Sequence, residues 1–84
     1  MSESLPVLVV EDDEALREAL TDTLEMAGYG AIAAGNAEQA LALVDRYMPG
    51  LVLSDVQMPG MDGHALLDTL KSRQPEIPVI LMTA

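Results

Sequence analysis

The sequence predicts an α/β fold, a doubly wound parallel sheet with helices on both faces. Short apolar runs alternate with longer amphipathic segments along the 84 residues, which is typical of parallel strands joined by helical crossovers. Right-handed crossovers bring the C-terminal ends of all strands to one edge of such a sheet. Two of the apolar runs end in acidic residues, so the sequence also predicts an acidic site at that edge.

Four strands are predicted from the apolar runs, at residues 5–10, 29–33, 51–55 and 79–82. The run at 51–55 is apolar up to its last two residues, as expected of a strand covered on both faces. Pro6 lies near the start of the first strand, where a missing N–H is tolerated. The second strand has the weakest pattern of the four.

Three helices are predicted between these strands, at residues 14–27, at 37–47 and from about 62–64 onward. In the first helix, apolar residues spaced by three and four predict one inward stripe: Leu16, Ala19, Leu20, Leu24 and Ala27. The second helix has a similar stripe: Ala37, Ala40, Leu41, Val44 and Tyr47. Gly28 is expected just after the first helix, Asn36 with Gln39 at the start of the second, and Pro49-Gly50 as its stop.

The composition excludes several classes of function. Fourteen acidic residues against four basic ones give a net charge of −10, which argues against a surface for nucleic acid or anionic lipid and suits a cation. Without Cys, neither disulfides nor thiolate chemistry are available. No apolar run approaches the roughly 18 residues of a membrane span, and no signal peptide is visible. We therefore expect a cytoplasmic protein.

Three acidic residues at predicted strand ends form the candidate site: Asp12, Asp13 and Asp55. Carboxylates a few ångströms apart repel by roughly 1–4 kcal/mol per pair, so such a cluster either raises a pKa or binds a cation. Oxygen ligands favour Mg²⁺ or Mn²⁺. An Asp beside such an ion is suited to phosphorylation on its carboxylate. At the end of the fourth strand, Thr83 offers a hydroxyl to the phosphoryl group, and Ala84 leaves room for it.

Three segments, residues 10–13, 53–63 and 79–84, resemble the receiver domains of two-component response regulators. The resemblance implies that Asp55 accepts a phosphoryl group from the phosphohistidine of a sensor histidine kinase. It implies further roles for other residues: metal binding by Asp12, Asp13, Asp55 and the Gln57 carbonyl, phosphoryl sensing by Thr83 and Ala84, and loop shaping by Pro59, Gly60 and Gly63. Residues 11–20 and 55–67 most resemble receivers of the NtrC type, especially flagellar ones, which precede a σ54-activating ATPase and a DNA-binding domain.

The same resemblance implies a flavodoxin-like, CheY-like sheet of strand order 2-1-3-4-5. The sequence ends after the fourth strand, so we expect residues 1–84 to form a partial receiver domain without the fourth helix, fifth strand and fifth helix. The Lys that receivers carry at the end of the fifth strand then has no position. We expect a phosphoacceptor with at most slow hydrolysis of its own aspartyl phosphate, which normally regulates an attached transcriptional output domain.

Other interpretations of these residues remain open. Asp55 could be a solvated strand-end acid or a helix cap, and Asp12 and Asp13 could serve only the dipole of the following helix. A truncated receiver could act as a non-catalytic module that self-associates through the exposed edge of the fourth strand. A haloacid-dehalogenase-type phosphatase also uses a strand-end Asp, but it needs a second acid two residues later, where this sequence has Gln57.

Overall fold

The computed structural model describes residues 5–56 and 63–82. Within these ranges the elements are β1 (Val7–Val10), α1 (Glu14–Met26), β2 (Ala31–Ala34), α2 (Ala37–Tyr47), β3 (Leu51–Asp55), α3 (Gly63–Arg73) and β4 (Val79–Met82). The strands form one parallel sheet of order β2-β1-β3-β4. The predicted fold class and strand order are therefore confirmed. No helix in the described ranges is long and apolar enough to cross a membrane.

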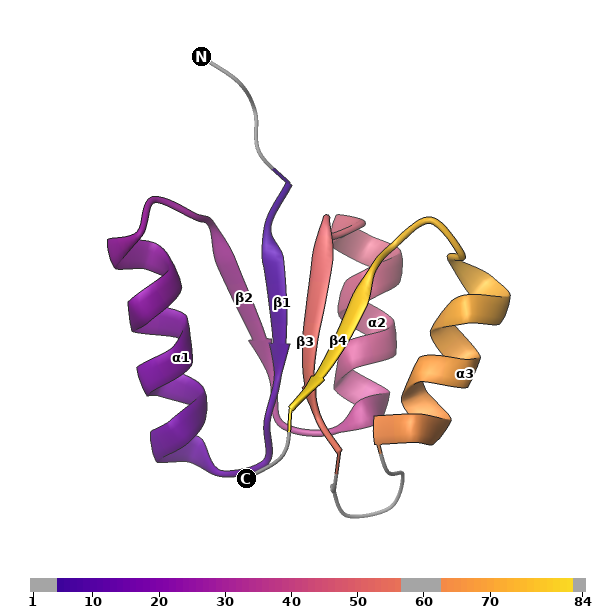
Figure 1. The fold of residues 1–84 in the computed structure, drawn as a ribbon, viewed down its shortest axis with the longest axis horizontal. Coiled ribbons are helices and arrows are strands. Elements are labelled where there is room, and N and C mark those ends of the chain that lie inside the picture. The colour runs from indigo at the N-terminus through magenta and orange to yellow at the C-terminus, as the bar shows by residue number, and fades with distance from the viewer. Residues whose placement is uncertain (1–4, 57–62, 83–84) are drawn as a thin grey trace.

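Helices cover both faces of this sheet: α1 lies on one side, and α2 and α3 lie on the other (Figure 1). The main core lies between the sheet and the α2–α3 layer. Its buried members are Leu8, Val10, Ala34, Ala37, Ala40, Val44, Val52, Leu66, Leu70 and Ile77. Val9 is also fully buried, and it faces the other side because side chains alternate along a strand. Strand β1 is thus covered on both faces.

The α1 side of the sheet is less well covered than the sequence predicted. No residue of α1 is fully buried; Leu20 and Leu24 are half-buried, whereas Leu16, Ala19 and Ala27 are exposed. Helix α1 contacts β1 and β2, and in the described part of the chain no second helix lies beside it over β3 and β4. The predicted stripe is wrong at its exposed positions because, in the described part of the chain, α1 packs only on β1 and β2 and has no helix beside it.

The same face of β4 is open for the same reason. The register pairs Val9 with Leu53 and Leu53 with Ile80, so these three side chains share the α1 face of the sheet. Val9 is fully buried and Leu53 half-buried, but Ile80 is 51% exposed. On the α1 face of the sheet, side chains therefore become more exposed from β1 to β4.

The ends of the helices follow the expected local rules, with one difference at the last residue of α2. The Asn36 side chain caps α2 by accepting from the Gln39 N–H at 2.8 Å, and Gly28 follows α1 with a φ of 96°, which favours glycine. Helix α2 ends at Tyr47 as predicted, and its C-cap Met48 adopts the left-handed conformation, with φ 48°, directly before Pro49. The last position of the predicted α2 stripe, Tyr47, is exposed.

Strand bounds agree with the prediction for β3 and β4 and differ for the other two. Strand β1 begins at Val7, whose N–H donates to the Gly30 carbonyl at 2.8 Å. Strand β2 starts two residues later than predicted because the Tyr29 N–H donates to the Leu24 carbonyl at 3.0 Å, within the C-terminal turn of α1. The turn after α1 thus uses residues that the apolar pattern assigned to the strand.

Candidate functional site

The candidate site lies where the parallel strands β1 and β3 end side by side. The register pairs Val9 of β1 with Leu53 of β3. Glu11 and Asp55 each follow two residues later in the sequence. Because residues two apart on a strand point to the same face, these two carboxylates both lie on the α1 side of the sheet. Strand pairing therefore brings together acids that are far apart in the sequence.

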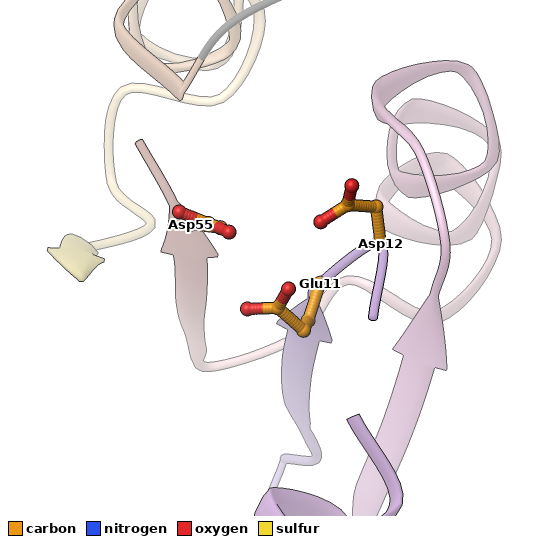
Figure 2. Close-up of side chains that lie close together, drawn as sticks. All are labelled: Glu11, Asp12 and Asp55. Carbon is orange, nitrogen blue, oxygen red and sulfur yellow. The ribbon is translucent and has the colours of Figure 1, made fainter. Parts of the chain in front are cut away.

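A third carboxylate completes the cluster. Ligand oxygens of Glu11, Asp12 and Asp55 all lie within 4.8 Å of one another. Figure 2 shows the three side chains around a common space, Glu11 at the end of β1, Asp12 on the loop that follows and Asp55 at the end of β3. Glu11 is 3% exposed and Asp55 9%, whereas Asp12 is exposed. Solvent reaches the cluster from the side of Asp12.

Glu11 is held at several atoms. Its N–H donates to the Ala34 carbonyl at 3.0 Å, and its own carbonyl accepts from Nη1 of Arg17 at 2.8 Å. Its carboxylate oxygen Oε2 accepts from the N–H of Asp13 at 3.1 Å. The main chain that carries the acidic run is therefore tied to both β2 and α1.

The environment of Glu11 disfavours its charged form. Burial raises the pKa of the Glu11 carboxyl above its ordinary value, and the neighbouring carboxyls of Asp12 and Asp55 raise it further. The hydrogen bond from the Asp13 N–H acts in the opposite direction and lowers this pKa. A cation in the cluster would offset the cost of holding Glu11 ionised.

The main chain around Asp55 is also fixed. Oγ of Ser54 donates to the Asp55 carbonyl at 3.0 Å, and Ser54 is fully buried. One residue later, the Val56 N–H donates to the Met82 carbonyl at 2.9 Å, which continues the pairing with β4 past the end of β3. Asp55 therefore projects from a backbone that is held on both sides of it.

The structure brings Asp12 and Asp55 together but does not place Asp13 with them. The Asp13 side chain instead caps α1, where Oδ1 accepts from the Leu16 N–H at 3.2 Å. Glu11 takes the place in the cluster that sequence reasoning assigned to Asp13. The signal was present in the sequence, since Glu11 lies two residues after the buried Val9 and so shares its face.

The remaining predicted site residues divide into two groups. Gly63 is the first residue of α3. The others lie outside the described residues, and their roles stay predictions: Gln57, Pro59, Gly60, Thr83 and Ala84.

The donor set of the cluster fits a hard divalent cation. All three groups are carboxylates with oxygens close enough to share one ion, and carboxylate oxygens are preferred ligands of Mg²⁺ and Mn²⁺. Mg²⁺ is commonly bound by one or two carboxylates together with water and phosphate oxygens. The cluster is therefore suited to a cation that also takes water or phosphate oxygens as ligands.

Comparison with known proteins shows which family this sequence resembles. The family model described as "Response regulator receiver domain" matches residues 7–84. The response regulator protein FleR of Pseudomonas aeruginosa is 56% identical over 78 residues, which cover 93% of this chain and 16% of FleR. The transcriptional regulator NtrC of Salmonella typhimurium is 45% identical over 78 residues, covering 93% of this chain and 17% of NtrC. The chain thus spans less than a fifth of either relative.

A solved structure extends the likeness to three dimensions. The response regulator TrrA of Thermotoga maritima, solved in complex with Mg²⁺–BeF, superposes with a TM-score of 0.90 at 33% identity, covering 94% of this chain and 69% of TrrA. The resemblance found in the sequence, including its NtrC-type character, is confirmed by these matches. The chain belongs to the family of response regulator receiver domains.

Proposed function

We propose that Asp55 of this receiver accepts a phosphoryl group from the phosphohistidine of a sensor histidine kinase, with Mg²⁺ or Mn²⁺ at the acidic cluster. The observation that carries the proposal is the convergence of Asp55 with Glu11 and Asp12 within 4.8 Å. An acid that only ends a strand in contact with solvent would not require two further carboxylates beside it. Three acids that share one space are expected at a site whose cation supplies the missing positive charge.

Glu11, Asp12 and Asp55 would hold the cation, with the Gln57 carbonyl as a further oxygen ligand. A cation held there would supply positive charge to neutralise the phosphoryl oxygens during transfer. Asp13 is left out of this ligand set because its carboxylate caps α1. That TrrA, which has a similar fold, was solved in complex with Mg²⁺–BeF supports binding of a divalent cation by this chain.

In the transfer, a carboxylate oxygen of Asp55 forms the new bond to phosphorus. The phosphorus–nitrogen bond of the phosphohistidine breaks, and the imidazole leaves with its bonding electron pair. Ser54 and Val56 keep the Asp55 backbone in place while its side chain reacts. Thr83 and Ala84 would meet the attached phosphoryl group, and Pro59, Gly60 and Gly63 would shape the loop beside it.

Phosphorylation would regulate a transcriptional output domain in the cytoplasm. Support comes from the relatives, one named a response regulator protein and another a DNA-binding transcriptional regulator. The alternative of a haloacid-dehalogenase-type phosphatase is not retained, because the chain matches the receiver family over residues 7–84.

Phosphorylation of the purified chain by acetyl phosphate with Mg²⁺ tests this proposal. We expect wild type to gain an acyl phosphate, detected by mass spectrometry and removed by hydroxylamine, and Asp55→Asn to gain none. Asp22→Asn makes the same chemical change at an exposed position of α1 and serves as the control that keeps wild-type labelling. Equal labelling of Asp55→Asn and wild type would reject Asp55 as the acceptor.

A second candidate function is self-association through β4. This strand forms an edge of the described sheet, and Ile80 on its α1 face is 51% exposed. An open edge with an apolar face favours pairing with another chain. Sedimentation would show wild-type dimers that Ile80→Lys converts to monomers, whereas a wild type that stays monomeric across the accessible concentration range would eliminate this candidate.

A further inference from the structure

Arg17 reaches back from α1 to the acidic end of β1. Its Nη1 donates to the main-chain carbonyl of Glu11 at 2.8 Å, and the side chain is half-buried. Its own N–H donates to the Asp13 carbonyl at 2.8 Å, which places Arg17 in the first turn of α1. One residue therefore closes the turn from Glu11 to Asp13 at both ends, through its backbone and through its side chain.

The guanidinium lies against Gly35, on the loop between β2 and α2. A Cβ added at Gly35 would lie 3.1 Å from Nη1 of Arg17, closer than an ordinary van der Waals contact. Gly35 itself is held by α2, because its N–H donates to Oε1 of Gln39 at 2.9 Å. Gly28 has a positive φ, whereas no positive φ requires a glycine at position 35, so the missing side chain there serves the close approach of Arg17.

We propose that Arg17 is a positioning residue for the acidic site and that Gly35 provides the space it needs. The guanidinium, lodged against Gly35, fixes the carbonyl of Glu11 and with it the turn that presents the Glu11 and Asp12 carboxylates to the cation. This inference rests on the proposed cation site. It adds a residue that makes no contact with the cation and acts through the main chain of Glu11.

The physical reason is that clustered carboxylates repel one another, so a backbone that is held in place is needed to keep them together. Glu11 is almost fully buried, and Arg17 donates the hydrogen bond to its carbonyl. A buried carbonyl that loses its donor favours conformations in which it finds another partner. In such conformations the Glu11 and Asp12 side chains would no longer converge on Asp55. Outer residues that orient metal ligands typically affect affinity by about 10-fold to 100-fold.

The first test compares Mg²⁺ binding by calorimetry for wild type, Arg17→Gln and Arg17→Lys. We expect Arg17→Gln to weaken binding by about tenfold and to melt at a lower temperature because the buried Glu11 carbonyl loses a donor, and Arg17→Lys to recover part of the affinity by donating one hydrogen bond. Arg46→Gln removes the same charge from the last turn of α2, where Arg46 stacks on Tyr47. This control should bind like wild type, and equal affinity of Arg17→Gln and wild type would overturn the proposal.

A double-mutant cycle with Gly35→Ala tests the pairing of the two residues. The added methyl group should push the guanidinium aside and weaken Mg²⁺ binding on its own, but it should have no further effect in the Arg17→Gln background. Additive effects would show that Gly35 and Arg17 act independently, which contradicts the proposed arrangement.

A measurement without metal separates this inference from the proposed cation site. Amide exchange of Asp13, whose N–H donates to Glu11, should be faster in Arg17→Gln than in Arg46→Gln. Wild type that binds no Mg²⁺ would reject the cation site, while the exchange rates would still decide whether Arg17 orders the turn. Unchanged exchange in Arg17→Gln would reject the role of Arg17 whatever the metal does.

Discussion

The main-chain N–H of Asp13 donates to the carboxylate oxygen Oε2 of Glu11 at 3.1 Å. At the same time, the carboxylate of Asp13 accepts from the Leu16 N–H and caps α1. Three consecutive acids therefore do different things: Glu11 and Asp12 face Asp55, and Asp13 begins the helix. Substitutions along this run should separate metal binding from folding.

Replacing Glu11 by Gln should change how stability depends on pH. Burial raises the native pKa of Glu11 above its ordinary value in the unfolded chain, so between these two pKa values the native state binds more protons than the unfolded state. Wild-type stability should then fall as pH rises through this window. Glu11→Gln lacks this loss, and its amide oxygen can still accept from the Asp13 N–H. Thermal unfolding without Mg²⁺, followed from about pH 4 to about pH 8, measures the difference.

The gain in stability of Glu11→Gln over wild type should grow with pH and shrink when Mg²⁺ is added to wild type. If the melting temperatures of wild type and Glu11→Gln differed by the same amount at every pH, the assigned direction of the Glu11 pKa shift would be contradicted.

Replacing Asp13 by Ala should affect folding far more than metal binding. Loss of an N-cap side chain typically costs about 1 kcal/mol, so urea unfolding should show a free energy of unfolding lower by that amount. Mg²⁺ affinity should stay close to wild type because Asp13 is not in the cluster. Asp12→Ala should give the reverse pattern, with Mg²⁺ binding lost and stability retained, since Asp12 is exposed. Equal loss of Mg²⁺ binding in both variants would return Asp13 to the ligand set.

Replacing Ser54 by Ala should lower stability through a single hydrogen bond. Its buried Oγ donates to the Asp55 carbonyl, and a bond of this kind contributes about 0.5–1.5 kcal/mol. Ser72→Ala, at an exposed position of α3, controls for the change of residue type. Chemical denaturation measures both variants, and a Ser54→Ala protein as stable as Ser72→Ala would refute the importance of this bond.

Replacing Arg73 by Gln should have a small effect. Arg73 on α3 pairs with Asp45 on α2, and the two side chains are 41% and 50% exposed. Exposed ion pairs contribute about 0–1 kcal/mol, and the difference from wild type should shrink in high salt. Leu66→Ala, at a fully buried position of the same helix, should cost about 2–5 kcal/mol. If Arg73→Gln cost as much as Leu66→Ala, the ion pair would matter more than its exposure indicates.

The alternating elements, the bounds of β3 and β4, and the position of Asp55 at the end of a strand could all be predicted from the amino-acid pattern. These features follow from local rules, because periodicity, caps and strand-end position act over a few neighbouring residues. Asn36 and Gly28 were found at their helix ends for the same reason.

Only the tertiary structure decided which acids of the run meet Asp55. That choice depends on the register between β1 and β3, which pairs Val9 with Leu53 and so carries Glu11 onto the face of Asp55. The exposure of Leu16 likewise depends on what lies beside α1. Both features depend on contacts between segments that are far apart in the sequence. Packing across the sheet determines these contacts, and no local pattern of residues encodes them.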